Sequence, residues 1–583
     1  MGLKKLLSAV ALLLSLSLFL GSCGDSAADA PTASGSEAQA ATIDDLQIRD
    51  SETIYKDDDE DSVVTMYLTV SQGNAAENTN HTWQDVNDHS VYYYEEQGLE
   101  RYAVEGILQV GDENGPIQGM FGYGEFAPNC TVTIRGKTST RSPQKSYRIE
   151  INKNEGYWRE QRVINLNKHV YDSVRFRNKL SYDLLKTIPG AFSCRTQFVH
   201  LYVKDLTEGN TAAAFQDYGL YTQVEQINKA YLRNHGLDEN GQLYKATMFE
   251  FMRYEDAIKL SSDPSYDLTA FEQILEVKGN DDHTKLINML DDLNNYAIPI
   301  ETTFEKYFDE ENYFTWLAFQ ILTGNIDTIN QNFFLYSFQN GQKFYFISWD
   351  NDGAWSYEED ILYRGRPSGY YYMQGVSNYW GSILHQRVLK SDTYRQMLDD
   401  KINELRASIT AQRVAGMVET YSAIVIPYLT SLPDSMYATR SMAEVEQILP
   451  AISREMDHRY EAYQTSLQSP MPFYLGEPEP ADGGLSFGWD SSYDFDGEKI
   501  TYKFELARDY LFQDTVSVQD GLVIPQAFTE ELPEGEYFYR VTATNESGYT
   551  QTAMEAYDAL DETRHYGVVN FYVQADGSIL WDV

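Results

Sequence analysis

Several motifs that mark well-known enzyme classes are missing from this sequence. It has no GxxxxGK[ST] phosphate loop, no HExxH, no GxSxG and no Cys/His cluster at zinc spacing. Only nine histidines occur among 583 residues, and none stands in a recognisable catalytic setting. The sequence therefore argues against P-loop NTPases, HExxH metalloproteases and enzymes built on a histidine-based triad.

Basic residues are also scarce. The chain has 45 Lys and Arg against 88 Asp and Glu, which gives a formal net charge of -43. An anionic membrane surface or a nucleic-acid backbone would be repelled at long range, so we expect no nucleic-acid partner. Solubility of an exported protein explains the charge, and docking of cations or basic proteins is the alternative.

Long apolar runs are confined to the N-terminus. Two lysines precede LLSAVALLLSLSLFL, which is typical of a signal peptide and too short for a comfortable membrane span. The LGSC sequence that ends at Cys23 resembles a bacterial lipobox, in which the cysteine is acylated and becomes the mature N-terminus. We predict a lipoprotein signal peptide at 1–22 and a lipid anchor at Cys23. The anchor would hold the protein on the extracellular face of the bacterial cell membrane.

Two further cysteines remain, Cys130 and Cys194. An even pair in an oxidising compartment can form a disulfide. Two buried free thiols fit the sequence equally well, and the sequence leaves both alternatives open.

Composition divides the rest of the chain. Residues 23–45 are rich in Ala, Ser, Gly, Asp and Thr, which predicts a flexible tether. The acidic run KDDDEDS at 56–62 lacks the Gly and the distal Glu of a calcium loop, so we expect a solvated linker there.

Strand patterns precede helical ones in residues 46–469. Short alternating runs such as VVTMYLTV and CTVTIRG occupy 63–151, and helical spacing dominates 267–323 and 379–467. The Asn340-Gly341 pair between two aromatic runs predicts a β-hairpin. We expect an α+β domain of catalytic size.

A Pro/Gly-rich linker at 470–482 separates that domain from residues 483–583, which show only strand patterns. EGEYFYRVTATNESG resembles the penultimate strand region of fibronectin type III domains, and Trp489 is a candidate core aromatic. We expect a small all-β sandwich of the fibronectin type III or immunoglobulin-like kind, acting as a spacer or adhesive module.

Four polar residues could carry chemistry. Asp327 and Asn332 are five residues apart, as in the HRDxxxxN loop of protein kinases, and Asp350 follows the predicted hairpin as the Asp of DFG does. Asp352 stands two residues further on. Phosphoryl transfer from ATP needs Mg²⁺ held by hard oxygen ligands and a carboxylate at the acceptor hydroxyl. Asp and Asn are also common in turns, so the spacing alone leaves both readings open.

Five motifs, in order, resemble the spore-coat protein H (CotH) kinase family. They are TIRGKTSTRSPQKSYRIEI, RFRNKLSYDLL, GLYTQVEQINKAYLRN, NIDTINQNFFLY and FYFISWDND. The resemblance covers about residues 50–467. It implies an atypical protein-kinase-like catalytic domain that uses ATP and Mg²⁺.

The resemblance implies roles for two groups of residues. Asp327 would be the catalytic Asp, with Asn332, Asp350 and Asp352 as metal ligands. The nucleotide-binding group would be Lys145, Glu225, Arg135 and Arg177.

Within the nucleotide group, the individual roles differ. Lys145 would contact the ATP phosphates, and Glu225 would pair with Lys145 or assist the metal unless it forms a structural ion pair. Arg135 and Arg177 would neutralise phosphate charge unless each anchors a carboxylate of the fold. Gln144 stands where the family has a Lys, which puts the grip on the nucleotide in doubt.

The predicted function is a secreted, lipid-anchored, Mg²⁺-dependent kinase. It would transfer the γ-phosphate of ATP to Ser or Thr of an extracellular or coat protein, and the resemblance favours basic or Ser-rich substrates. The alternative is a non-catalytic surface lipoprotein for adhesion or for binding cell-wall polysaccharide. The lipid anchor, the β-sandwich and the scarcity of ATP outside the cell favour that alternative, whereas the four polar residues favour the kinase.

Overall fold

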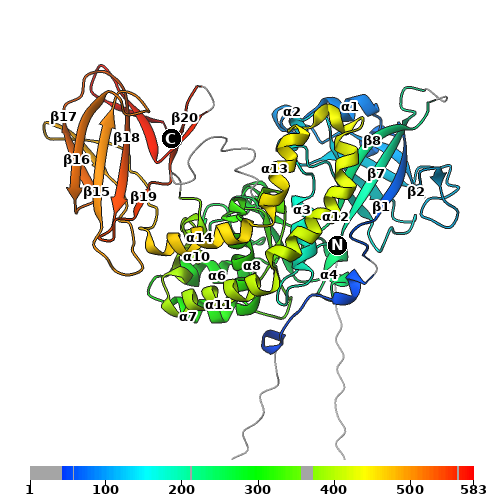
Figure 1. The fold of residues 1–583 in the computed structure, drawn as a ribbon, viewed down its shortest axis with the longest axis horizontal. Coiled ribbons are helices and arrows are strands. Elements are labelled where there is room, and N and C mark those ends of the chain that lie inside the picture. The colour runs from blue at the N-terminus through cyan, green and yellow to red at the C-terminus, as the bar shows by residue number, and fades with distance from the viewer. Residues whose placement is uncertain (1–42, 57, 210–212, 356–371, 561–562, 583) are drawn as a thin grey trace, which may run out of the picture. The chain divides into compact units, whose positions relative to one another are not determined.

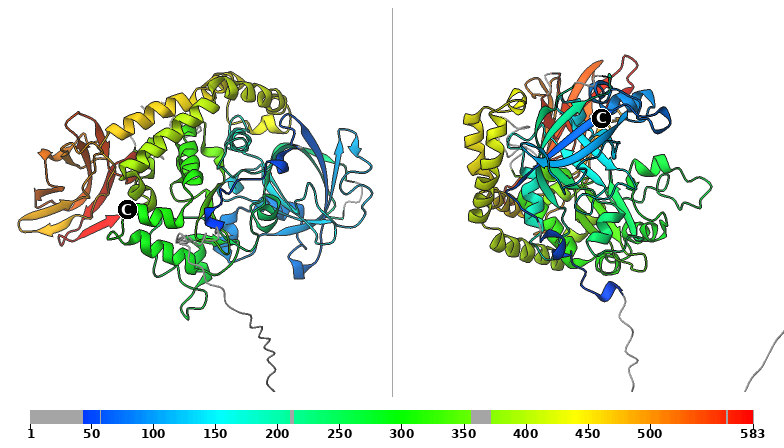
Figure 2. Two further views of the ribbon diagram at one scale, coloured as in Figure 1. Left: turned by 90° about the horizontal axis from the view of Figure 1, so that it is seen from below. Right: turned by 90° about the vertical axis from the view of Figure 1, so that its right-hand side faces the viewer.

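The computed structural model describes residues 43–583 apart from 57, 210–212, 356–371, 561–562 and 583 (Figures 1 and 2). The predicted signal peptide, Cys23 and most of the tether lie outside the described residues. The described part combines helices with sheets, which confirms the α+β prediction. Within it, no helix has both the length and the apolar character that a membrane span requires.

The first sheet closes on itself. Its strands follow the order β1-β7-β8-β6-β5-β4-β2-β3, and β1 also pairs antiparallel with β2. Alternate residues of β2 and β4 are buried, so one face of these strands lies against a core that includes Leu68, Leu108 and Ile149. The strands are β1 (Val63–Ser71), β2 (Ala103–Asp112), β3 (Gly115–Pro116), β4 (Cys130–Arg135), β5 (Ser146–Ile151), β6 (Val163–Asn167), β7 (Thr196–Asp205) and β8 (Gln216–Glu225).

Four short helices accompany this sheet. They are α1 (Trp83–Asp88), α2 (Val91–Gln97), α3 (Arg177–Leu185) and α4 (Lys229–Asn234). Every residue of α3 is buried, polar ones included. Its polar side chains therefore need partners inside the protein.

A second sheet lies among the longer helices (Figure 1). Its order is β10-β9-β11-β12, and its hairpin of β11 (Phe333–Ser337) and β12 (Tyr345–Ser348) confirms the hairpin prediction. The other elements of this block are β9 (Gln242–Ala246), β10 (Leu275–Val277), α5 (Leu268–Glu272), α6 (Thr284–Asn294), α7 (Ile300–Tyr307), α8 (Glu310–Thr323), α10 (Ile383–Leu389), α11 (Asp392–Ser408), α12 (Ala411–Leu429), α13 (Met442–Ile452) and α14 (Glu455–Gln468).

Helix α8 is the most deeply buried of these helices. Asp309 caps its N-terminus by accepting a hydrogen bond from the Asn312 N–H. Gly324 ends it in the left-handed region at φ 66°, where a Cβ would meet the Arg459 guanidinium at 2.4 Å. This abrupt end turns the chain toward β11 and fixes where the following polar residues begin.

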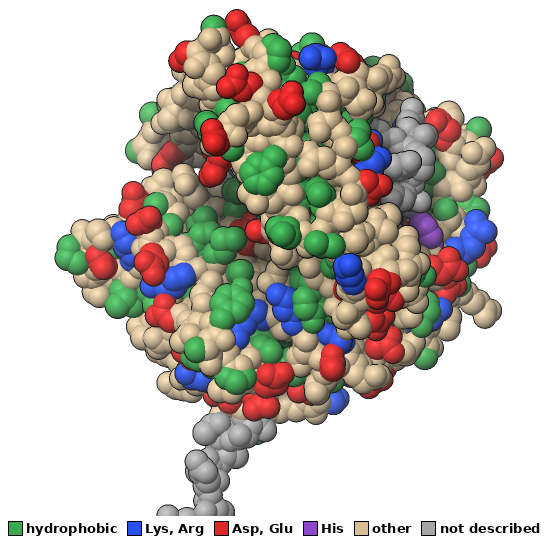
Figure 3. All heavy atoms as spheres, turned by 90° about the vertical axis from the view of Figure 1, so that its left-hand side faces the viewer, with side chains coloured by type: hydrophobic (Ala, Val, Ile, Leu, Met, Phe, Trp, Pro, Cys, Tyr) green, Lys and Arg blue, Asp and Glu red, His purple; other side chains and the backbone are tan. Residues whose placement is uncertain are grey.

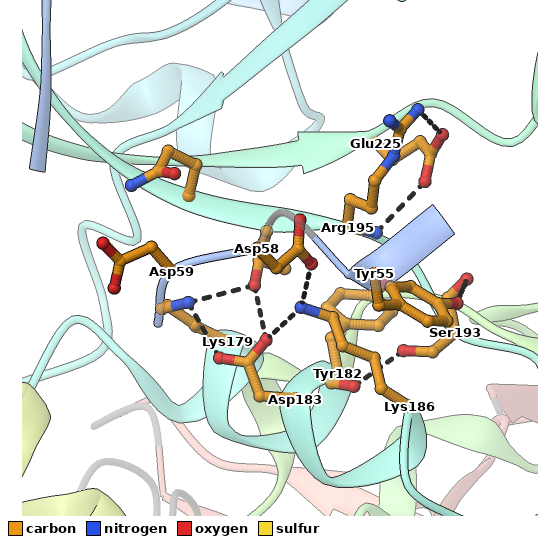
Figure 4. Close-up of polar contacts among 12 residues, drawn as sticks. Tyr55, Asp58, Asp59, Lys179, Tyr182, Asp183, Lys186, Ser193, Arg195 and Glu225 are labelled. Atoms are coloured by element: carbon orange, nitrogen blue, oxygen red, sulfur yellow. Dashed lines mark hydrogen bonds and ion pairs between the residues drawn. The ribbon is translucent and has the colours of Figure 1, made fainter. Parts of the chain in front are cut away.

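The predicted solvated linker at 56–62 is exposed at Lys56, Asp59, Glu60 and Asp61, but the N-terminal segment that contains it is also tied to the core. Asp50 forms an ion pair with His235 at 2.6 Å. Asp58 forms one with Lys186 at 2.7 Å (Figure 4). Both contacts join residues more than a hundred positions apart in the sequence, so local composition could not reveal them. The acidic run is therefore anchored to the core at Asp58.

The C-terminal residues form two main antiparallel sheets. One contains β13 (Glu479–Ala481), β14 (Gly484–Gly488) and β17 (Gln526–Glu530); the other contains β15 (Thr501–Ala507), β16 (Thr515–Leu522), β18 (Gly535–Thr544), β19 (Thr550–Thr552), β22 (Val568–Val573) and β23 (Ile579–Asp582). A hairpin of β20 (Ala556–Asp558) and β21 (Arg564–Tyr566) stands apart. Phe487 and Phe504 from the two main sheets share one core, and Trp489 is only 7% exposed there, as predicted. The fibronectin type III resemblance stays a prediction.

Cys130 and Cys194 are free thiols, and both are buried. They lie in different hydrophobic clusters, Cys130 in the core of the closed sheet and Cys194 in the larger helical core. Burial raises the pKa of both thiols, which disfavours the reactive thiolate. Of the two alternatives, a disulfide and a pair of buried free thiols, the structure shows the buried free thiols.

The charged surface is mixed on the face shown in Figure 3. Acidic side chains are dispersed there among Lys and Arg, without one continuous acidic patch. A dispersed distribution of this kind fits the solubility explanation of the net charge.

Candidate functional site

The four polar residues singled out in the sequence lie together. Asn332 donates a hydrogen bond from Nδ2 to Asp327 Oδ2 at 2.8 Å. The charge of Asp352 raises the pKa of both Asp327 and Asp350, so the three carboxyls are electrostatic neighbours. The end of α8 and the β11–β12 hairpin supply all four residues.

The backbone that presents these groups is held in sparsely populated conformations. Asn332 has φ 60° and Asp350 has φ 53°, both in the left-handed region. Two hydrogen bonds fix this geometry: the Trp349 N–H donates to the Asn332 carbonyl, and the Asp350 N–H donates to the Tyr182 hydroxyl. Strained residues of this kind often mark functional sites, because the surrounding structure must hold them in place.

Negative charge is concentrated in the cluster. Burial first and the charge of Asp352 second raise the pKa of Asp350 to about 7, against the opposing effect of Arg135 and His169. Asp327 is reached by solvent, but the protein around it partly desolvates the carboxyl and raises its pKa to about 6. Carboxyls that resist ionisation in this way are stabilised by a bound cation.

Two groups from the closed sheet face these acids. Arg135, the last residue of β4, lies close enough to Asp350 for its charge to lower the pKa of that carboxyl. His169 follows β6, and its Nδ1 lies 3.8 Å from Asp352 Oδ2. The sequence analysis missed His169, because a lone histidine after a strand has no motif that sets it apart.

The donor set suits a hard cation. Asp350, Asp352 and Asn332 offer carboxylate and amide oxygens, which Mg²⁺ prefers. Across the described residues, no three acid, His or Cys side chains converge tightly enough to form a complete metal cage. Mg²⁺ usually takes only one or two carboxylates and completes its shell with water and phosphate oxygens, so the residues fit this ion.

Lys145 does not face the cluster. Its side chain is buried, and Nζ donates to the Thr140 carbonyl at 2.6 Å. Burial lowers the pKa of Lys145, and the acid that opposes this effect is Asp88 at the end of α1. The predicted contact of Lys145 with phosphate is therefore not supported by its position.

Glu225 does not pair with Lys145, which was one of the predicted roles of Glu225. Its carboxylate instead binds Arg195 at 2.7 Å and His235 at 3.1 Å, in a buried position (Figure 4). This is the structural ion pair that the sequence analysis left as the alternative. It lies on the side of the fold where Asp50 and Asp58 dock.

Arg177 also has a structural position. It is fully buried, and Nη1 lies 2.5 Å from Asp172 Oδ1 while Nε donates to the Trp355 carbonyl at 2.9 Å. Arg177 thus anchors a carboxylate of the fold and supports the chain just after Asp352. A direct contact with phosphate would require its release from the core.

The Glu225–His235 pair predicts a pH dependence of stability. Burial alone would lower the pKa of His235, but hydrogen bonds to Asp50 and Glu225 raise it from 6.5 to about 9. A raised pKa stabilises the fold fully below pH 6.5, and this contribution is lost as pH rises through 9. We expect the free energy of unfolding to fall by about 2–3 kcal/mol over this window. Urea unfolding of the protein and of His235→Gln measures it, and equal pH slopes for the two would contradict the pairing.

A family model described as CotH kinase protein matches residues 132–463, which is more than half of the chain. The matched range contains all four clustered residues and Arg135. It begins later than the resemblance seen in the sequence, which extended back to about residue 50. The comparison with curated proteins found no match.

Proposed function

The chain belongs to the CotH kinase family, and from that premise we propose that it is a Mg²⁺-dependent kinase that transfers the γ-phosphate of ATP to Ser or Thr of a protein. The observation that carries the proposal is the cluster of Asp327, Asn332, Asp350 and Asp352 opposite Arg135. A protein that only binds a surface has no need for three mutually repelling carboxyls.

Each residue of the cluster has a role in the proposal. Asp350 would be the principal metal ligand, with Asn332 and Asp352 as further oxygen donors. Bound Mg²⁺ would neutralise phosphate charge in the transition state. Arg135 would bind phosphate oxygens from the opposite wall, because a guanidinium suits that geometry.

Asp327 would act on the acceptor hydroxyl. Its raised pKa of about 6 favours proton acceptance near neutral pH. Hydrogen bonds from Gln331 and Asn332 hold the carboxylate in place. Solvent reaches Asp327, so a protein substrate could reach it as well.

The setting of the reaction is also a proposal. The lipobox at Cys23 would anchor the protein to the extracellular face of the bacterial cell membrane. The acidic net charge favours a basic or Ser-rich extracellular or coat protein as substrate. The C-terminal sheets would serve as a spacer or binding module.

Label transfer tests the proposed function. The full chain, purified in a mild detergent, is incubated with γ-labelled ATP, Mg²⁺ and a basic Ser-rich protein. We expect transfer by the wild type and at least about 100-fold slower transfer by Asp327→Asn, which keeps the shape of the side chain but accepts no proton. Equal transfer by both proteins, or none by the wild type, would overturn the proposal.

A pair of variants separates the two basic residues predicted to bind phosphate. Arg135→Ala is expected to weaken the affinity for Mg-ATP by about tenfold or more, since it removes a charge-assisted hydrogen bond. Lys145→Ala is the matched control and should change the affinity less than about twofold, because Lys145 faces Thr140 and Asp88. Isothermal titration calorimetry measures both. The reverse order would show that Lys145 turns into the site when the nucleotide binds.

A further inference from the structure

The loop between β6 and α3 holds His169 in a strained conformation. His169 has φ 48°, in the left-handed region that residues other than glycine rarely adopt. Such a conformation costs about 1–3 kcal/mol and persists only where neighbouring contacts enforce it. The loop must therefore be held from several sides.

Lys168, the residue before His169, provides most of these restraints. Its Nζ forms a buried ion pair with Asp434 at 2.7 Å and donates to the carbonyls of Tyr218 and Leu220. Its backbone N–H donates to Ser146 Oγ at 2.9 Å. Main chain and side chain of Lys168 are both fixed, so the backbone from which the His169 side chain projects is held in place.

Two further hydrogen bonds restrain the backbone at Lys168 and His169. Arg175 Nη1 donates to the Lys168 carbonyl at 2.6 Å, and the Asp172 N–H donates to the His169 carbonyl at 3.0 Å. Asp434 comes from the segment after α12, so the helical block also secures this loop. These contacts hold the backbone of the loop from several sides and explain how His169 is kept in the left-handed region.

The imidazole faces the acidic cluster and pairs with Asp352. Its side chain is only 4% exposed, and Nδ1 lies 3.8 Å from Asp352 Oδ2. Nε2 is buried and has no hydrogen-bond partner among the described residues. A proton on Nε2 would be a buried donor without an acceptor, whereas a proton on Nδ1 faces a carboxylate. The surroundings thus favour the tautomer that points an N–H at Asp352.

The contact with this ring is the ion pair that the structure gives the Asp352 carboxylate. The Asp352 side chain is 46% exposed. Within the described part of the chain, it has no other ion pair or side-chain hydrogen bond. The carboxylate of Asp350 repels that of Asp352 and therefore cannot hold it in place. Without His169 the carboxylate would be free to turn away from the cluster.

We propose that His169 is a positioning residue, which orients Asp352 as a ligand for the Mg²⁺ ion of the site. The inference rests on the proposed function, since it assigns to one of the proposed metal ligands the side chain that holds it in place. Partners of this kind fix the direction of a ligand, and their loss typically costs 10–100-fold in metal affinity. Loss of His169 should therefore raise the Mg²⁺ concentration that ATP binding requires.

Three substitutions of His169 separate the effect of losing its N–H donor from the effect of relieving its backbone strain. His169→Asn keeps an N–H near the place of Nδ1 and tolerates the left-handed region. His169→Gly relieves the strain but removes the donor, and His169→Ala removes the donor and keeps the strain. His81→Ala, which removes a histidine bonded to Asn78, is the control.

The readout is the Mg²⁺ concentration that gives half of the maximal ATP binding, measured by calorimetry on the full-length protein. We expect this concentration to rise about tenfold for His169→Gly and His169→Ala, and to stay within about twofold for His169→Asn and the control. Asp352→Asn should raise it at least as much, because it alters the ligand itself, and adding His169→Gly to it should have no further effect, because His169 acts only through Asp352.

The outcomes distinguish the two proposals. An unchanged Mg²⁺ requirement in the folded His169→Gly protein would overturn the positioning role and leave the kinase proposal standing. The positioning role would also be overturned if His169→Asn required as much Mg²⁺ as His169→Gly. If the wild type binds ATP without regard to Mg²⁺, both proposals fail, because Asp352 then has no ion to hold.

Discussion

Asp350→Asn is expected to lower the affinity for Mg-ATP by about 100-fold or more while leaving the fold intact. Loss of a carboxylate at the ion removes a ligand and its charge, which should cost at least as much as the roughly 10- to 100-fold in metal affinity lost with a group that only orients a ligand. Asparagine has nearly the same shape and tolerates the φ of 53° at this position. The variant therefore removes charge with little strain.

The same substitution should raise stability in the absence of nucleotide. Burial and the nearby Asp352 raise the pKa of Asp350 to about 7, so the ionised form opposes folding near and above that pH. Removing the charge removes that penalty, and the melting temperature without ligand should rise at pH 8. Asp400→Asn, on the exposed side of α11, is the control and should change neither quantity.

Calorimetry and thermal unfolding check both halves of this prediction. An Asp350→Asn protein that binds Mg-ATP as tightly as the wild type would exclude Asp350 as a ligand. A variant that loses binding and also melts far below the wild type would indicate a structural role instead.

Asp183→Ala is expected to lower the free energy of unfolding by about 3–5 kcal/mol. Asp183 is completely buried on α3 and holds Lys179 at 2.8 Å and Lys186 at 2.7 Å (Figure 4). Its carboxylate also accepts hydrogen bonds from Thr196 and from the Tyr421 hydroxyl of α12. Removing one partner of a buried ion pair leaves uncompensated charge in the core, which is the costly case.

An exposed ion pair provides the control for this prediction. Asp392 pairs with Arg395 on α11, but the Asp392 side chain is 92% exposed. Water screens that pair, so Asp392→Ala should cost less than about 1 kcal/mol. Urea unfolding measures both variants, and equal losses would contradict the view that burial makes the Asp183 hub important.

The local features of the site could be predicted from the sequence. Asp327 and Asn332 are close in the chain, and the hairpin returns Asp350 to the same end of the sheet. The spacing in the sequence was therefore enough to predict that these three residues lie near one another. The resemblance to fibronectin type III strands made Trp489 a candidate core aromatic, and it is buried.

The features that were missed depend on pairing between distant segments. Glu225 binds His235 and Arg195 rather than Lys145, because the register between β6 and β8 sets its surroundings. Asp58 is anchored by Lys186, which lies 128 residues away. His169 is aimed by Lys168 and Asp434, which are joined only in the folded protein. Composition and periodicity carry no information about such contacts.

Arg177 illustrates a different limit. Its motif suggested a role toward phosphate, but full burial and the pair with Asp172 give it a structural one. An arginine on a helix reads the same in sequence whether it points into the core or into a cleft. Only the packing of α3 against the residues after β12 distinguishes the two.

The most direct test of the account is the position of the ion. The protein is crystallised with Mn²⁺ and a non-hydrolysable ATP analogue, and the metal is located by its anomalous scattering. We expect a peak within about 2.2 Å of an Asp350 oxygen, with Asp352 or Asn332 as a further ligand and a phosphate oxygen completing the shell. A metal bound elsewhere, or a nucleotide bound with no metal near Asp350, would contradict this expectation.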